Sequence, residues 1–142
     1  MTTVAIHSDS EPFGSAVALA GAFASAILEP AWWPEDIGQV GYDLDNHPRG
    51  GSSYRIGSLR SDGRLIVVIG RPQRDGDPMR GLPSANWHDI PQLASYSAVV
   101  ANENRAVRAV LMRDGLTVQL LGYMSEAELV RAVESLQLVA TG

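Results

Sequence analysis

The chain has 142 residues, with 16 acidic and 11 basic side chains, so its formal net charge at pH 7 is −5. It contains no cysteine, which excludes disulfides, iron–sulfur clusters and cysteine-ligated zinc. Every basic residue is an arginine, and the arginines are scattered along the chain. A nucleic-acid-binding domain usually carries a basic stripe and a positive net charge, so the composition argues against nucleic acid as a partner.

The length and an apolar content of 45% predict one domain over residues 1–142, with a single hydrophobic core. The uncharged stretch of residues 12–28 consists mainly of Ala, Gly and Ser, so its hydrophobicity is modest. The segment before it carries Asp9 and Glu11 and no basic residue, unlike the start of a secretory signal. We therefore expect a buried helix rather than a membrane span, and a cytoplasmic location.

The N-terminal part of the chain is predicted to form a tail over residues 1–10 and then a helix over residues 12–28. Ser10 suits the N-cap of this helix, and Pro12 suits its first turn, where the missing N–H costs little. Pro30 disfavours helical geometry in the residue before it, so the helix should end there.

The middle of the chain shows the patterns of strands. Alternating or continuous apolar residues predict strands at about residues 40–44, 54–59, 65–69, 97–101, 106–112 and 116–123. Asp-Gly pairs at residues 62–63 and 114–115 are typical of tight hairpin turns. The run at 65–69 is apolar at every position, which indicates a central strand. Residues 71–91 contain four prolines and are expected to form an irregular loop, whose length favours a functional role.

The C-terminal part has the pattern of a capped helix. Ser125 and Glu128 have the spacing of a capping box, in which each side chain accepts a backbone N–H. An apolar stripe follows at helical spacing, formed by Leu129, Val130, Val133 and Leu136. The order of helix, strands and helix predicts an α+β fold: a curved antiparallel sheet of about five to seven strands packed against an N-terminal and a C-terminal helix.

Candidate catalytic residues are few. The three histidines, His7, His47 and His88, lack the spacing of a metal motif, so we predict no metal site. His88 is followed by Asp89, and a carboxylate can orient an imidazole for acid–base chemistry; the alternative is a hydrogen-bonded surface histidine. No phosphate-binding loop, dinucleotide fingerprint or nucleophile elbow is present, and we predict no cofactor.

Aromatic residues are the candidates for binding. Adjacent tryptophans in an extended link cannot both face the core, so one should meet solvent, a partner or a ligand. The alternative is that one fills the core and the other caps the end of the sheet. The candidate binding residues are Trp32, Trp33, Tyr42, Tyr54 and Trp87.

Several segments share the pattern of a known domain family. They are the Pro-aromatic-Pro link of residues 30–35, the strong strand of 63–70 and the closing segments 112–118, 122–129 and 133–136. Together they resemble an uncharacterised bacterial family found at the outer end of anti-sigma-factor-like and sporulation-related membrane proteins. The resemblance implies a fold similar to lipoprotein carriers and periplasmic stress sensors, and it implies no catalytic residues.

These observations favour a non-enzymatic binding or regulatory domain. We expect it to take a lipid-like apolar molecule, a peptide or a partner protein in a groove of the sheet. One alternative is a small enzyme that uses His88 and Asp89, with His47 brought close by the fold. Another is a self-associating protein, such as a homodimer, that pairs through a sheet edge or the Ala-rich helix.

Overall fold

The computed structural model describes residues 10–46, 51–73, 97–100 and 106–141. The elements are, in chain order, β1 (Ser10–Phe13), α1 (Ala16–Phe23), β2 (Ile27–Pro30), β3 (Gly41–Asn46), β4 (Ser52–Leu59), β5 (Leu65–Pro72), β6 (Ser97–Val100), β7 (Ala106–Arg113), β8 (Leu116–Tyr123), α2 (Glu126–Glu134) and β9 (Leu136–Val139). Seven strands form an antiparallel sheet in the order β1-β3-β4-β5-β8-β7-β6, and β2 pairs with β9 in a second, small sheet. The structure therefore confirms the α+β prediction.

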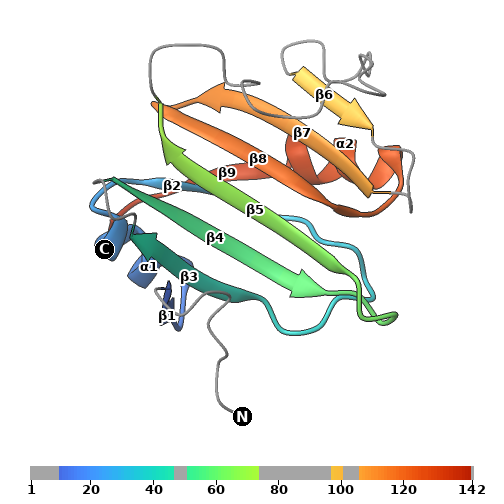
Figure 1. Ribbon diagram of the computed structural model, residues 1–142, viewed down its shortest axis with the longest axis horizontal. Coiled ribbons are helices and arrows are strands. Elements are labelled where there is room, and N and C mark those ends of the chain that lie inside the picture. The colour runs from blue at the N-terminus through green and yellow to red at the C-terminus, as the bar shows by residue number, and fades with distance from the viewer. Residues whose placement is uncertain (1–9, 47–50, 74–96, 101–105, 142) are drawn as a thin grey trace.

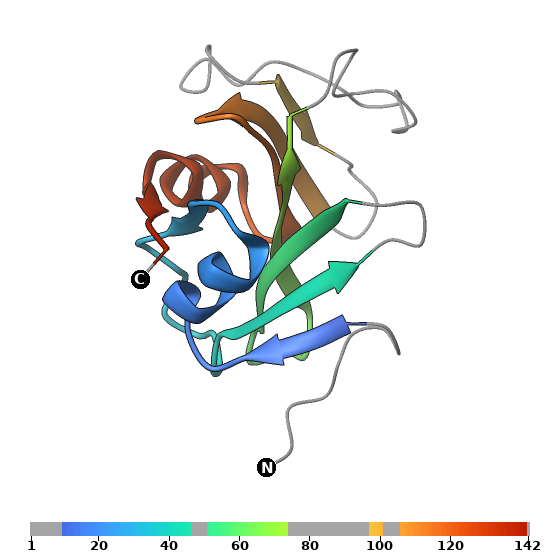
Figure 2. The ribbon, with the colours of Figure 1, turned by 90° about the vertical axis from the view of Figure 1, so that its left-hand side faces the viewer.

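Both helices and the small sheet lie on one side of the seven-stranded sheet, which we call the helix side (Figures 1 and 2). Strand residues that point to this side alternate with residues that point away from it, as the pleat requires. The core lies between the two layers. Its largest fully buried side chains are Leu19, Ile27, Leu28, Tyr54, Ile56, Ile66, Val68, Leu116, Leu120 and Leu129.

The opposite side of the sheet, which we call the open face, is covered by no helix in the described part of the chain (Figure 2). Its centre is formed by the strand residues that alternate with the core residues: Arg55, Val67, Ile69, Val110, Gln119 and Leu121. Val67 and Val110 are nevertheless buried, at 5% and 1% exposed.

The predicted hairpins form where the Asp-Gly pairs occur. Gly63 has φ +84° in the turn between β4 and β5, where the N–H of Arg60 donates to the carbonyl of Arg64 at 2.8 Å. Asp114 and Gly115, with φ +54° and +76°, connect β7 to β8, and two successive positive φ values suit a tight hairpin turn. The apolar strand β5 is the fourth of the seven strands, so the prediction of a central strand is confirmed.

The prediction of a long N-terminal helix was wrong, because only Ala16–Phe23 is helical. Ser15 rather than Ser10 is the N-cap, and its hydroxyl accepts the N–H of Ala18 at 3.1 Å. Ala24 ends the helix in the left-handed conformation, at φ +62°. The residues on either side of the helix form strands instead, since pairing with β3 and β9 satisfies their backbone groups.

No helix in the described ranges is both long enough and apolar enough to cross a bilayer.

The C-terminal capping box is confirmed. Ser125 Oγ accepts the N–H of Glu128 at 3.1 Å, and Glu128 Oε1 accepts the N–H of Ser125 at 3.0 Å. The helix ends at Glu134, however, so the prediction that Leu136 continues its stripe was wrong. Leu136 begins β9 and still packs in the core, at 4% exposed.

The predicted irregular loop begins later than expected. Strand β5 runs to Pro72 and pairs with β8 as far as Leu116. The part of the predicted loop from residue 74 onward lies outside the described residues.

The buried hydroxyl of Tyr54 connects the two sheets. It donates to the carbonyl oxygen of Leu28 at 2.9 Å and accepts the N–H of the same residue at 3.0 Å. The ring of Phe23 meets the Tyr54 ring edge-on, with centroids 5.3 Å apart. Gly70 leaves room for the ring, because a Cβ at that position would overlap the Tyr54 side chain. Tyr54 therefore holds β2 and α1 against the middle of the large sheet.

We predict that Tyr54→Phe destabilises the protein by about 1–3 kcal/mol, because both backbone groups of Leu28 lose a buried hydrogen-bond partner. Urea unfolding of the variant and the wild type measures this difference. Tyr123→Phe is the matched control, since its hydroxyl makes no hydrogen bond to any described residue. Equal losses in the two variants would contradict a special role for the Tyr54 hydroxyl.

Candidate functional site

Two of the predicted aromatic residues point to the helix side of the sheet. Tyr54 is fully buried in the core. Tyr42 is half-buried, packs against the core and forms a side-chain hydrogen bond with Glu29 of β2. Neither side chain contributes to the open face.

The adjacent tryptophans are both half-buried and pack against the core. The backbone N–H of Trp32 donates to Ser135 Oγ at 3.1 Å, and the guanidinium of Arg131 lies 4.6 Å from the centre of the Trp32 ring. This cation–π contact joins the link to the end of α2. A binding role for Trp32 and Trp33 stays a prediction.

The remaining candidates, His47, Trp87, His88 and Asp89, lie outside the described residues, as does His7. Their roles stay predictions. Within the described ranges, no group of three or more His, Cys, Asp or Glu side chains is arranged to hold a metal ion.

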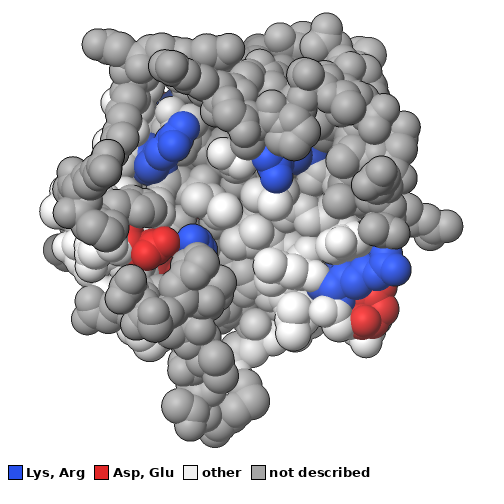
Figure 3. Space-filling model, in the orientation of Figure 1, with Lys and Arg blue, Asp and Glu red and all other residues white. Residues whose placement is uncertain are grey.

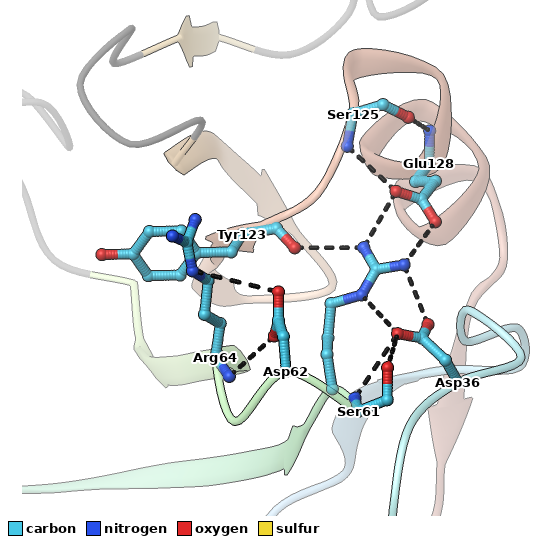
Figure 4. A network of polar contacts seen from close by, with 8 residues as sticks. Asp36, Ser61, Asp62, Arg64, Tyr123, Ser125 and Glu128 are labelled. Carbon is cyan, nitrogen blue, oxygen red and sulfur yellow. Dashed lines mark hydrogen bonds and ion pairs between the residues drawn. The ribbon is translucent and has the colours of Figure 1, made fainter.

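Asp36, Tyr123 and Glu128 in Figure 4 all contact one guanidinium, which belongs to Arg60, and the sequence around Arg60 did not predict this network. The Arg60 guanidinium donates to Asp36 at 2.8 and 3.1 Å, to Glu128 at 3.0 and 3.1 Å, and to the carbonyl of Tyr123 at 3.1 Å. These hydrogen bonds lower the pKa of Asp36 to about 2 and also lower the pKa of Glu128. A guanidinium has five N–H groups, so none is left for a ligand. We interpret the network as a structural clamp between the β4–β5 turn and α2.

Glu29 is a second unusual carboxyl group. Its side chain forms hydrogen bonds with Tyr42 and Gln137, which lower its pKa, but burial is the larger effect and raises the pKa above 4.5. Burial, and then the charge of Glu29, raise the pKa of Tyr42 in turn. Glu29 Oε2 is enclosed and has no hydrogen-bond partner among the described residues. The enclosed oxygen makes Glu29 a candidate for an effect on stability.

The strand register arranges the open-face residues in rows. Across β5, β8 and β7, one row contains Arg71, Thr117 and Met112, the next contains Ile69, Gln119 and Val110, and the third contains Val67, Leu121 and Arg108. Leu59 and Leu65 pair directly across β4 and β5, nearer the hairpin turn.

This face combines exposed apolar groups with arginines. The exposed fractions of Leu59, Leu65 and Met112 are 54%, 40% and 47%. Figure 3 looks onto this face: most of the described surface at its centre is uncharged, and the arginine side chains lie at separate points around that area. Arg55 is paired with Asp45 at 3.1 Å. The open face is therefore the candidate binding surface of the described part of the chain.

Comparisons with protein-family models, with curated proteins and with solved structures found no match for this chain.

We predict that Glu29→Gln stabilises the protein increasingly as the pH rises above 4.5. The pKa of Glu29 is raised in the folded state, so its neutral form is favoured there. Protonated Glu29 favours the folded state. This contribution to stability is fully present below the pKa that Glu29 has in the unfolded chain, and it is lost as the pH rises through the pKa that Glu29 has in the folded protein. The side-chain amide of Gln does not ionise, so the variant does not lose stability in this way. Urea unfolding of both proteins from pH 4 to pH 8 measures the difference. The same substitution at the exposed Glu134 is the control, and a difference that does not vary with pH at position 29 would contradict the prediction.

Proposed function

We propose that the protein is a non-enzymatic binding or regulatory domain that binds a partner protein through the open face. The observation that carries this proposal is the exposure of Leu59, Leu65 and Met112 on the sheet face that no described helix covers. They are three of the five large apolar side chains that are exposed in the described part of the chain. Exposed apolar surface of this kind often marks an interaction site.

The dimensions of the face favour a protein over a small molecule. Seven strands at about 4.8 Å spacing make it about 30 Å wide, and an eight-residue strand is about 27 Å long. The exposed part is smaller than this outline, because β1, β3 and β6 are shorter and Val67, Val110 and Thr117 on this face are 5%, 1% and 4% exposed. Small ligands instead occupy concave pockets that enclose most of their surface. A lipid-like molecule is the alternative occupant.

Two further parts of the proposal are supported by the sequence. The regulatory role is supported by the resemblance of the closing segments to a domain of anti-sigma-factor-like proteins. The cytoplasmic location is supported by the absence of cysteine, which fits a reducing compartment.

Self-association through the helix side is a second candidate function. Val17 of α1 and Leu138 of β9 are 49% and 50% exposed, and α1 contains no charged residue. A homodimer would cover these side chains and leave the open face uncovered.

Paired double variants test which face binds. Leu59→Ser with Leu65→Ser changes the open face, and Val17→Ser with Leu138→Ser is the matched control on the helix side. All four side chains are about half exposed, so the effects on folding should be small. We expect a partner protein to co-purify from the native host with the wild type and with the control, but not with the open-face variant.

Mass spectrometry identifies the species that are recovered, and thermal unfolding confirms that each variant is folded. Two results would contradict the proposal. One is loss of the partner in the helix-side variant alone. The other is recovery of a small-molecule adduct on the open face with no partner protein.

A further inference from the structure

Two arginines on the open face lack the interactions that the other described arginines make. Four arginines form ion pairs with carboxylates: Arg55, Arg60, Arg64 and Arg113. Arg131 stacks on Trp32. Arg71 and Arg108 have neither an ion pair nor a ring contact with any described residue, although acidic side chains outnumber basic ones in the chain. The two arginines without an ion pair to a described residue therefore belong to one surface.

The register fixes the spacing between these two arginines. Arg71 on β5 is opposite Thr117 of β8, and Arg108 on β7 is opposite Leu121 of β8. Thr117 and Leu121 are four positions apart on one strand, which corresponds to about 13 Å, and β5 and β7 are two strand spacings apart, or about 10 Å. The Cα atoms of the two arginines are therefore about 16 Å apart.

Gln119 of β8 lies at the midpoint between the two arginines, in the one row that separates theirs. Ile69 is beside Gln119 on β5, and Leu121 is two positions along β8 in the row of Arg108; both are half-buried. These two apolar side chains flank the midpoint and offer an apolar contact there.

We propose, building on the proposed function, that the open face binds an extended segment of the partner protein that carries two acidic residues four positions apart and an apolar residue midway between them. Residues i, i+2 and i+4 of an extended chain point to the same side, and i and i+4 are about 13 Å apart. The long side chains of Arg and Glu span the remaining few ångströms. One acidic residue contacts Arg71, the other contacts Arg108, and the apolar residue packs on Ile69 and Leu121.

Two arginines whose Cα atoms are about 16 Å apart can contact two carboxylates of one extended segment at the same time. The ion pairs are exposed, and their main effect is on orientation and partner choice, while the apolar contact supplies buried area. Binding should weaken as the salt concentration rises.

Three short probe peptides test this inference by NMR titration of the ¹⁵N-labelled protein. The first is an acetylated pentapeptide with Glu at its first and last positions and Leu in the centre. The second replaces both Glu residues with Gln, and the third places the two Glu residues at adjacent positions. We expect saturable shifts at Arg71, Ile69, Leu121 and Arg108 with the first peptide, and weaker binding of the other two.

The matching protein variants are Arg71→Gln, Arg108→Gln and, as the control on the helix side, Arg131→Gln. The first two should each weaken binding of the first peptide about two- to fivefold, as expected for an exposed ion pair, and the control should leave it unchanged. The spectrum of each variant also shows whether it is folded.

Equal binding of all three peptides, or equal loss of binding in all three variants, would overturn the inference. So would shifts that map to other surfaces. The proposed function has its own test: it is wrong if no partner protein is lost when Leu59 and Leu65 are replaced by Ser. If the partner depends on those leucines but not on Arg71 or Arg108, the proposed function stands and this inference fails.

Discussion

The two hydrogen bonds between the Tyr54 hydroxyl and the backbone of Leu28 hold the small sheet against the centre of the large one. The Arg60 clamp secures the other end of the same layer, because it joins the β4–β5 turn to the start of α2. With both attachments on the same side, α1, α2, β2 and β9 all pack on one face of the seven-stranded sheet. The open face is the consequence of this one-sided arrangement.

The two sides of the large sheet differ in the kinds of side chain that they carry. The carboxyl groups with shifted pKa values, Glu29, Asp36 and Glu128, have partners that connect one element of the fold to another. The open face instead combines exposed leucines and a methionine with Arg71 and Arg108, which have no ion-pair partner among the described residues. A shape-complementary protein surface can satisfy both kinds of group at once.

Sequence patterns predicted the parts of the fold that depend on neighbouring residues. The capping box of Ser125, the Asp-Gly turns and the central position of β5 follow from local signals of this kind. The segment of residues 12–28 was predicted less well, because its strands depend on pairing with β3 and β9, far away in the sequence. Arg60 was missed for the same reason, since Glu128 is 68 positions away. The aromatic residues were predicted to line a binding groove, and Tyr54 is instead fully buried in the core. The face and exposure of a strand residue depend on the strand register, which cannot be read from composition.

The central claim is that the open face is the surface that binds a partner. The most direct measurement is photo-crosslinking in the native host, with a photoreactive amino acid placed at Leu65 and, in a separate protein, at Val17. Both positions are exposed, and they lie on opposite sides of the sheet. The account predicts a discrete crosslinked protein from position 65 and none from position 17. A crosslink from position 17 alone would contradict it and would assign binding to the helix side.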